Sequence, residues 1–305
     1  MKAFVLPYAG AELPQLAEVA PPATSADELL VRVKAVGVGI HDSYFLPGDA
    51  TYPYPIGIEA AGVVETAGLA VTAHHPGDRV AFVSSMQPKG GTWAEFVAVR
   101  ADSLIVSVPE TMSFVEAAAL PVAGNTVLRA LRALGPAAGS LFIAGGSGAI
   151  GTLAIQLAVR RGWRVAASAS EGNRDYLRSL GAELAVDYRD PCWAAQVLRW
   201  MPGGVDAAIA VQPDTSTGSL GVVRDGGGLI SISGDRLEPE RGIVVQVVPH
   251  SADVGDELSR LMLDVAAGEV RVEIEQVLAF EDAGEALAKV ATRHARGKIV
   301  LQLDA

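Results

Sequence analysis

The stretch that decides the fold is Ser140-Leu-Phe-Ile-Ala-Gly-Gly-Ser-Gly-Ala-Ile-Gly151, which runs into an apolar helical pattern ending near Arg161. Glycine lets the backbone turn sharply and approach a phosphate without a Cβ in the way. The helix that follows presents free N–H groups and the positive end of its dipole to an anion. The sequence therefore predicts a strand, turn and helix that bind a dinucleotide pyrophosphate. The expected contacts lie in the turn and the first helical turn: Gly145, Ser147, Gly148, Ala149, Ile150 and Gly151.

Around this turn, strand and helix patterns alternate along the chain. The expected strands are 140–144, 164–169, 184–186, 207–211 and 228–233, and the expected helices lie near 150–161, 172–180, 192–200 and 215–224. This alternation predicts a parallel sheet with right-handed crossovers. The chain then continues with a helix at 256–267, a strand at 270–277, a helix at 282–292 and a strand at 298–302.

The chain before residue 118 has a different character, rich in β-branched residues, Gly and Pro. Short strands are expected at 29–38, 62–67, 79–83 and 92–99. Ser113 and Glu116 form the pattern of a capping box, which marks the first helix. We expect an α/β protein in which a Rossmann domain, 119–265, with a doubly wound parallel sheet is inserted into a β-rich, barrel-like domain, 1–118 plus 266–305.

Composition narrows the class of protein. With 305 residues, 50% of them apolar and 19% charged, the chain is expected to be globular with two domains. No apolar run is long enough to cross a bilayer, and the N-terminus lacks the apolar core of a secretory signal. A net charge of −11 argues against a nucleic-acid partner. Cys192 is the single cysteine, so we expect no intrachain disulfide and a cytoplasmic location.

Six segments, in order, resemble the medium-chain dehydrogenase/reductases, in particular their zinc-independent quinone oxidoreductases. These segments are Gly37–Asp42, Tyr52–Val64, Pro76–Val80, Gly91–Glu95, the glycine turn with Ala154–Ala158, and Gly297–Leu301. The resemblance implies a GroES-like β-rich domain, a nicotinamide cofactor and a small-molecule substrate. It also implies that Glu59 orders the active site by hydrogen bonding.

The chain departs from the zinc-dependent members of this superfamily. They carry a cysteine where this chain has Gly39, a histidine where it has Ile58, and a lobe with four cysteines. One cysteine and five scattered histidines cannot supply converging tetrahedral ligands, so no metal is expected. Quinone reductases often have asparagine at the Gly39 position, facing the nicotinamide. Gly39 offers no side-chain hydrogen bond, and the neighbouring His41 is a candidate replacement.

The second strand of the predicted Rossmann domain indicates which cofactor is used. NAD sites usually end this strand in an acid that binds the ribose hydroxyls, but here Ala169 holds that place. By resemblance, Ser168, Arg174 and Tyr188 would hold the 2′-phosphate and adenosine of NADPH. The alternatives are that Arg174 is a solvated helix residue beside Asp175, and that Glu171 repels a phosphate.

Three further positions are expected to contact the cofactor near its nicotinamide. Thr126 is implied by the resemblance, with a plain role in its helix as the alternative. Val211 and Ser233 end strands, and ligands of such sheets sit at the carboxyl ends of the strands. These two positions could equally be ordinary strand-end turns.

The candidate catalytic residues are His41, Asp42 and Tyr52. His41 can donate a hydrogen bond to a carbonyl oxygen, although a lone histidine is more often structural. Asp42 matches an acid of the family, and capping of nearby N–H groups is an equal alternative. Tyr52 lies in a Pro-rich loop, where packing is somewhat favoured over catalysis. The proton required after hydride transfer could come from water or from a tyrosine.

Three functions remain open from the sequence. The favoured one is NADPH-dependent, metal-free hydride transfer to a quinone or another activated, α,β-unsaturated carbonyl. The others are reduction of a 2-enoyl thioester and NADPH binding without catalysis. The apolar segment 243–248 could pair two copies into a homodimer, or it could be an interior strand.

Overall fold

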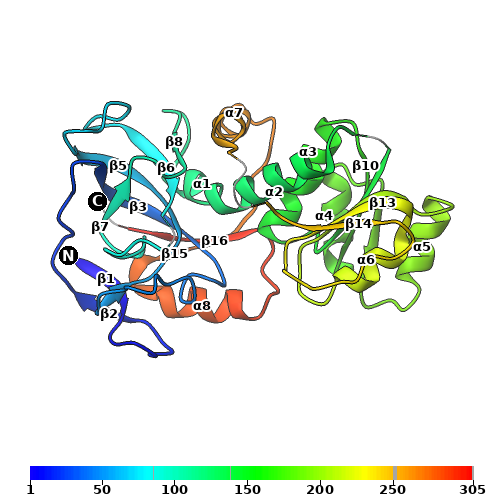
Figure 1. Cartoon of the computed structure of the whole chain (residues 1–305), viewed down its shortest axis with the longest axis horizontal. Coiled ribbons are helices and arrows are strands. Elements are labelled where there is room, and N and C mark those ends of the chain that lie inside the picture. The colour runs from blue at the N-terminus through cyan, green and yellow to red at the C-terminus, as the bar shows by residue number, and fades with distance from the viewer. Residues whose placement is uncertain (85, 138, 250–252, 304–305) are drawn as a thin grey trace. The chain divides into compact units, whose positions relative to one another are not determined.

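The computed structural model describes residues 1–84, 86–137, 139–249 and 253–303, which form two compact units (Figure 1). Unit 1 comprises Met1–Val122 with Gly255–Ala305, and unit 2 comprises Ala123–Val254. The sequence predicted the boundaries at 118/119 and 265/266. The second boundary differs by a whole helix, because α7 (Gly255–Ala266) contacts β8 (Ile105–Ser107) of unit 1.

Unit 2 is built on a parallel sheet, with strands in the order β11-β10-β9-β12-β13-β14 among the described residues. The strands are β9 (Ser140–Ala144), β10 (Arg164–Ala169), β11 (Leu184–Asp187), β12 (Val205–Ala210), β13 (Val223–Ser231) and β14 (Val244–Val247). Each neighbouring pair is parallel, and all five residues of β9 are buried, as suits a central strand covered on both faces. The predicted doubly wound sheet is confirmed, and its order reverses between β9 and β12.

The helices of unit 2 follow its strands. They are α2 (Pro121–Leu134, which starts in unit 1), α3 (Ala149–Arg160), α4 (Arg174–Ser179) after a 3-10 turn η1 (Glu171–Asn173), α5 (Trp193–Trp200) and α6 (Ser216–Val222). The predicted helix at 215–224 ends early because Val223 already begins β13. Arg224 donates from Nε to Asp206 Oδ1 at 2.8 Å, which ties the start of β13 to β12. Local sequence does not reveal a pairing between such distant residues.

Unit 1 is β-rich and mostly antiparallel. Its strands are β1 (Lys2–Leu6), β2 (Gln15–Glu18), β3 (Glu28–Val38), β4 (Tyr54–Pro55), β5 (Glu59–Ala67), β6 (Arg79–Val83), β7 (Phe96–Arg100), β8, β15 (Ile274–Ala279) and β16 (Lys298–Gln302). β3 pairs with β5, β7 and β16, so it lies at the centre of the larger sheet. The predicted capping box is confirmed at α1 (Phe114–Ala118), where Ser113 Oγ accepts from the Glu116 N–H at 3.2 Å.

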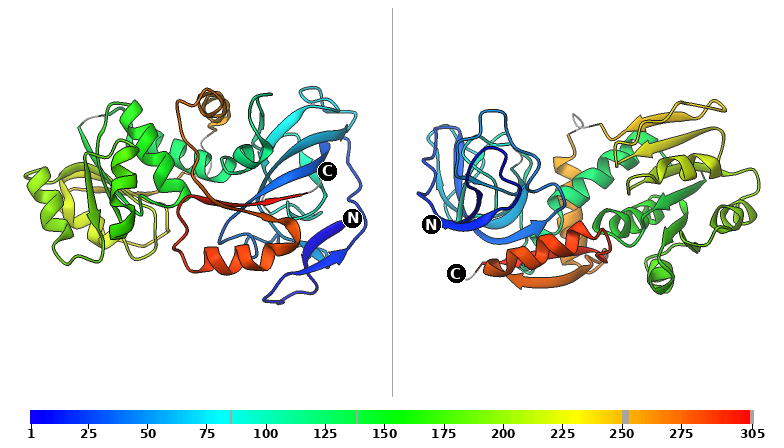
Figure 2. Two further views of the ribbon diagram at one scale, coloured as in Figure 1. Left: turned by 180° about the vertical axis from the view of Figure 1, so that it is seen from behind. Right: turned by 90° about the horizontal axis from the view of Figure 1, so that it is seen from below.

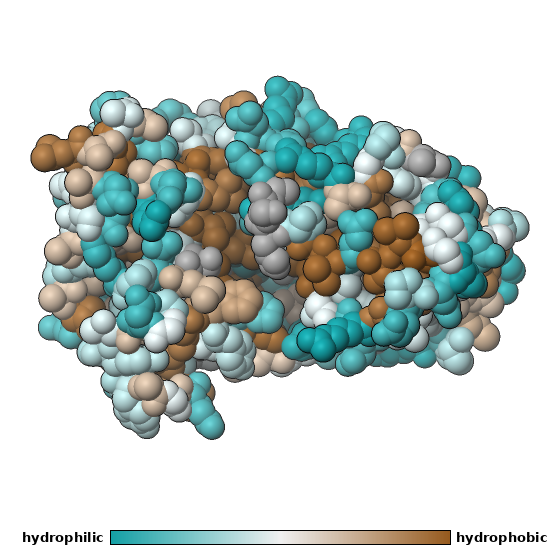
Figure 3. Space-filling view, in the orientation of Figure 1, coloured by the Kyte–Doolittle hydropathy of each residue, from teal (hydrophilic) through white to brown (hydrophobic). Residues whose placement is uncertain are grey.

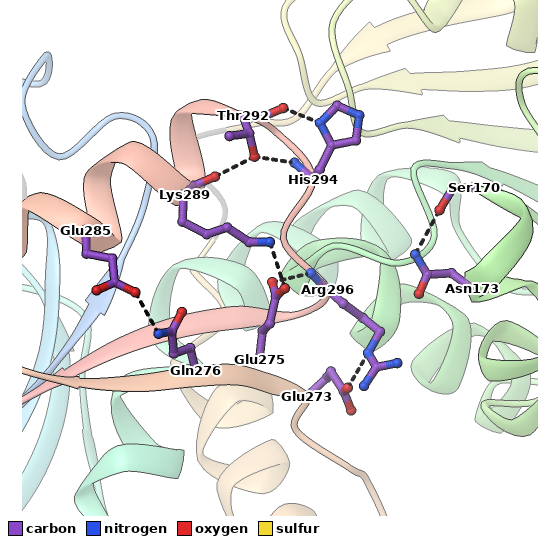
Figure 4. A network of polar contacts seen from close by, with 10 residues as sticks. All are labelled: Ser170, Asn173, Glu273, Glu275, Gln276, Glu285, Lys289, Thr292, His294 and Arg296. Carbon is purple, nitrogen blue, oxygen red and sulfur yellow. Dashed lines mark hydrogen bonds and ion pairs between the residues drawn. The ribbon is translucent and has the colours of Figure 1, made fainter.

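The C-terminal part of unit 1 is tied together by charged side chains. Helix α8 (Ala283–Ala291) lies along β15 and β16 (Figure 2). Lys289 pairs with Glu275 at 2.9 Å and Arg296 with Glu273 at 2.8 Å (Figure 4). The Lys298 N–H then donates to the Glu273 carbonyl at 2.8 Å. These contacts fix the start of β16, where the Lys298 side chain is buried inside unit 1.

Candidate active site

The glycine turn of unit 2 leaves no room for side chains at two of its glycines. Gly145 has φ +89°, and a Cβ there would lie 2.9 Å from Gln212 Cγ. A Cβ on Gly151 would lie 2.2 Å from the Gly145 carbonyl oxygen, so the first turn of α3 packs directly on the loop. The Gly146 N–H donates to the Ser168 carbonyl at 2.7 Å and holds the turn against β10.

Helix α3 begins without a side-chain cap. Its N-cap is Gly148, which has no side chain to accept from the first N–H groups of the helix. Ser147, Ala149 and Ile150 are half-buried, so the turn reaches the surface of unit 2. Free N–H groups at the positive end of a helix dipole, next to close-packed glycines, fit a pyrophosphate.

Two other predicted cofactor positions lie on strands next to the glycine turn. Val211 directly follows β12 and donates its N–H to the Ala144 carbonyl at 3.0 Å, and Ala210 pairs with Ala144 of β9. Ser233 follows β13, where Ser231 pairs with Ala210. The structure therefore brings Gly145, Val211 and Ser233 to the carboxyl ends of three neighbouring strands, at the place where the strand order reverses. Thr126 lies half-buried in α2.

The predicted phosphate residues surround the ends of β10 and β11. Arg174 donates from Nε to the Ala185 carbonyl at 3.0 Å, and no described residue accepts from its two terminal nitrogens. Its neighbour Asp175 instead pairs with Arg178 at 2.6 Å. Arg174 is thus anchored to β11 through its Nε, whereas the alternative was a solvated helix residue beside Asp175.

Ser168 and Tyr188 have different environments. Ser168 is buried, and its Oγ accepts from the Gly145 N–H at 3.3 Å, so its hydroxyl supports the glycine turn. Tyr188 is 45% exposed, with the Arg189 guanidinium 5.1 Å from its ring centre. Glu171, whose charge would oppose a phosphate, is exposed in η1.

Sequence reasoning assigned no role to two polar residues near these strand ends. Ser170 directly follows β10, and its Oγ accepts from Asn173 Nδ2 at 3.0 Å (Figure 4). Arg189 adds a second guanidinium next to Tyr188. The signal that could have found them is their position, because Ser170 directly follows Ala169 and Arg189 directly follows Tyr188.

In unit 1, Asp42 is 2% exposed and its carboxyl group is held by the backbone. The Gly39 N–H donates to Oδ2 at 2.8 Å, and the Gly57 N–H donates to the Asp42 carbonyl at 3.1 Å. Burial raises the pKa of Asp42 to about 7, although the charge of Lys298 acts in the opposite direction. This is the capping geometry that was the alternative to catalysis. The capping hydrogen bond itself lowers the pKa of Asp42, so the raised pKa is an effect of burial.

A buried ion pair lies beside this acid. Lys298 Nζ donates to Glu59 Oε1, and the two side chains are 7% and 2% exposed. The Val122 N–H donates to Glu59 Oε2 at 2.7 Å. A Cβ on Gly37 would lie 2.8 Å from Glu59 Cδ, so glycine is needed there for the carboxylate to fit. The sequence assigned no role to Lys298, and its place in the family ending Gly297–Leu301 was the available signal.

The other two catalytic candidates have aromatic neighbours. His41 is exposed and stacks on Phe45 with ring centres 5.0 Å apart. Partial desolvation of the ring and the charge of Arg293 lower the pKa of His41. Tyr52 is half-buried and packs against the hydrophobic core of unit 1. His41 and Asp42 are consecutive in the chain, but His41 is exposed and Asp42 is buried, while Tyr52 has the environment of a packing residue.

The donor set does not fit zinc. Gly39 and Ile58 stand where zinc-dependent members have ligands, and neither side chain can coordinate a metal. Across residues 1–84, 86–137, 139–249 and 253–303, no three His, Cys, Asp or Glu side chains group in a way that could hold an ion.

Known proteins share this combination of units. Residues 25–110 match the alcohol dehydrogenase GroES-like domain, and residues 180–301 match the zinc-binding dehydrogenase family. The 2-methylene-furan-3-one reductase of Solanum lycopersicum is 30% identical over 93% of this chain and 74% of its own length. The chain belongs to the medium-chain dehydrogenase/reductase superfamily.

Two further comparisons agree with this membership. The chloroplastic NADPH-dependent alkenal/one oxidoreductase of Arabidopsis thaliana is 30% identical over 99% of this medium-chain dehydrogenase/reductase and 79% of the plant protein. The structure of the quinone oxidoreductase from Coxiella burnetii superposes with a TM-score of 0.89 at 26% identity, covering 100% of this chain and 99% of that one. The predicted superfamily, fold class and oxidoreductase activity are confirmed, and the superfamily binds nicotinamide cofactors. No described helix has the length and apolar character of a membrane span.

Proposed function

We propose that this protein is an NADPH-dependent reductase that transfers hydride to quinones or other activated, α,β-unsaturated carbonyl compounds without a metal. The observation that carries the proposal is the glycine turn, where a Cβ on Gly151 would lie 2.2 Å from the Gly145 carbonyl, at the uncapped start of α3. Its fit to a pyrophosphate supports a dinucleotide cofactor. The named activities of the plant and bacterial relatives support the acceptor class.

The preference for NADPH over NADH is supported by the ends of β10 and β11. The last residue of β10 is Ala169, so no carboxylate stands where NAD sites bind the ribose. Arg174 keeps its terminal nitrogens available among the described residues, and Arg189 brings a second guanidinium to the same region. Guanidinium groups bind phosphate through paired, charged hydrogen bonds. We propose that Arg174 binds the 2′-phosphate and Tyr188 the adenosine.

In this reaction the protein has to position the cofactor and the acceptor and to supply a proton. When bound, reduced nicotinamide supplies the hydride, and the acceptor carbon is already electrophilic. Thr126, Val211 and Ser233 are proposed contacts near the nicotinamide. His41, Asp42 and Tyr52 remain the candidates for binding the carbonyl oxygen or supplying its proton. Asp42 is favoured because burial raises its pKa to about 7, where both protonation states are populated.

The test is oxidation of NADPH by the purified chain, followed at 340 nm, with a panel of quinones, short enones and 2-enoyl thioesters. Turnover of quinones or enones is expected. Turnover of enoyl thioesters alone would assign the second function, and tight NADPH binding with no turnover of any acceptor would assign the third. A preference for NADH in the same assay would contradict the cofactor assignment.

We also propose that two copies pair through β14, the edge strand of the sheet in unit 2. Val244 and Val247 are 55% and 60% exposed on this strand, and Figure 3 shows hydrophobic side chains gathered in its region. An apolar edge strand with unpaired backbone groups is a template for another strand. For location we propose the cytoplasm, on the basis that Cys192, the single cysteine, is exposed and unpaired.

A further inference from the structure

A side-chain position beside the Asp42 carboxyl group is unfilled because residue 39 is glycine. A Cβ built on Gly39 would lie 3.7 Å from Asp42 Oδ1 and 3.9 Å from Oδ2, with no nearer neighbour. A side chain at residue 39 would therefore stand against the carboxyl group in ordinary van der Waals contact. Gly39 itself is half-buried.

The Asp42 carboxyl group accepts a hydrogen bond from the Gly39 N–H, and the Trp93 side chain also interacts with it. Oδ2 accepts from the Gly39 N–H at 2.8 Å, while Oδ1 faces the position of the missing side chain. Asp42 as a whole is 2% exposed, so its carboxyl group is enclosed on its other sides by the protein. An oxygen atom of a small molecule that enters over Gly39 can come within hydrogen-bonding distance of Oδ1.

We propose that Gly39 forms a seat for the carbonyl oxygen of the substrate, and that Asp42 protonates this oxygen from Oδ1 when hydride reaches the substrate. The inference rests on the proposed reductase function and names the acid in it. It also limits the substrate, because the carbonyl group has to be narrow enough to approach backbone at Gly39. Enals and unbranched enones meet this condition, whereas ketones with a branched carbon next to the carbonyl do not.

The step is balanced without any further reagent. The hydride forms a C–H bond at the β-carbon, and the electron pair of the C=C bond shifts toward the carbonyl. The carbonyl oxygen takes the proton from Asp42, the Asp42 O–H bond breaks, and the product enol tautomerises to the saturated carbonyl compound. Oxidised nicotinamide and the Asp42 carboxylate remain, and the carboxylate recovers a proton from water.

The surroundings of Asp42 suit an acid that gives up and regains a proton. Burial favours its neutral form, and the nearby charge of Glu59 acts in the same direction. Lys298 and the Gly39 N–H stabilise the carboxylate that remains after transfer. Glu59 and Lys298 are themselves paired, so neither is a free acid or base beside the substrate.

The test uses Gly39→Asn, Gly39→Ala and Asp42→Asn in the full-length chain with NADPH and a short enone. Asp42→Asn should lower kcat by about 10²- to 10⁴-fold and abolish the fall of kcat above about pH 7. Both Gly39 variants should raise KM for the enone and lower kcat. Gly39 is outside the left-handed region, and its added Cβ meets only ordinary contacts, so Gly39→Ala is expected to fold. Gly48→Ala, in open space on the same loop, is the matched control and should behave as wild type.

A second measurement requires neither cofactor nor turnover. Because the Gly39 N–H donates to Asp42, the ¹H–¹⁵N shift of Gly39 should titrate near pH 7 in the wild type and stop titrating in Asp42→Asn. If the wild type reduces enones but Asp42→Asn keeps its alkaline limb, or Gly39→Asn keeps its kcat and KM, the seat is wrong and the reductase function stands. Failure of the wild type on every acceptor would instead contradict the proposed function.

Discussion

Lys298 Nζ donates a hydrogen bond to Glu59 Oε1 inside unit 1, although the two residues are 239 positions apart in the chain. The pair joins β16 to β5 through β3, and both side chains are almost fully buried. The charges of Glu59 and Lys298 cancel each other. The net charge of the buried cluster formed by Glu59, Lys298 and Asp42 therefore depends on Asp42. With Asp42 protonated the cluster is neutral, and with Asp42 ionised it carries one buried negative charge. The stability of unit 1 is therefore expected to depend on the protonation state of Asp42.

Breaking this pair from one side should be strongly destabilising. Lys298→Met leaves the Glu59 carboxylate buried with no cation, and we expect a loss of about 3–5 kcal/mol in the free energy of unfolding. Urea denaturation followed by circular dichroism measures it. Lys2→Met is the control, because its pair with Glu281 is about half exposed and should contribute ~1 kcal/mol or less. Equal losses in the two variants would contradict this account of the buried pair.

Replacing Asp42 should change how stability depends on pH. The pKa of Asp42 is raised from 3.8 to about 7 in the folded chain, so the folded state binds the proton more tightly than the unfolded state. The stabilisation of the folded state by the proton on Asp42 is complete below about pH 4. It declines as the pH rises to about 7 and is absent above that pH. The free energy of unfolding is expected to change by roughly 4 kcal/mol over this pH range because of Asp42.

Asp42→Asn removes this dependence. Relative to the wild type, the variant should gain stability as the pH rises from 4 to 8, because asparagine stays neutral. Thermal unfolding of both proteins at several pH values checks the prediction. A difference in stability that is constant across this range would show that Asp42 does not titrate there.

Adding one methyl group to the glycine turn should disrupt cofactor binding. In Gly151→Ala the new Cβ would lie 2.2 Å from the Gly145 carbonyl oxygen, so α3 or the turn has to move. We expect Kd for NADPH to rise at least about tenfold, the equivalent of losing one hydrogen bond to a charged group. Gly172→Ala in η1, where no atom lies within 4 Å of the added Cβ, should leave Kd unchanged. Fluorescence titration of NADPH measures both, and a wild-type Kd in Gly151→Ala would disprove the role of the turn.

Arg174→Ala should separate the two cofactors. Loss of charged hydrogen bonds to the 2′-phosphate should weaken NADPH by about 1.5–3 kcal/mol and barely affect NADH. Arg178→Ala is the matched control, since Arg178 lies on the same helix and pairs with Asp175 at 2.6 Å. Equal losses for NADPH and NADH in Arg174→Ala would mean that Arg174 does not contact the 2′-phosphate.

A charge on the edge strand of unit 2 should prevent pairing of two copies. Val247→Glu places a carboxylate at a 60% exposed position of β14, and we expect the protein to change from dimer to monomer. Size-exclusion chromatography with light scattering measures the mass in solution. Val277→Glu is the control, on the exposed edge strand β15 of unit 1 at 45% exposure. A monomeric wild type, or a dimeric Val247→Glu, would contradict the β14 interface.

Several features of this protein could be read from short stretches of sequence because their causes are local. Strands β6, β9, β10 and β16 have the predicted bounds, and the Ser113–Glu116 capping box forms as expected. Gly145 has φ +89° in the turn at 145–151, a backbone conformation that glycine favours. The two units divide between Val254 and Gly255, whereas the sequence predicted a boundary at 265/266. The difference arises because the packing of α7 on β8 involves residues far apart in the chain.

The sequence by itself determined the parallel sheet, the glycine turn and the absence of ligands at positions 39 and 58. It also singled out His41, Asp42 and Arg174 as candidates for chemistry. Only the tertiary structure decided that Asp42 is enclosed with its carboxyl group beside Gly39, and that Lys298 meets Glu59. The physical reason is range: propensities and turns act over a few residues, whereas burial and the charges that set a pKa depend on strands brought together from opposite ends of the chain.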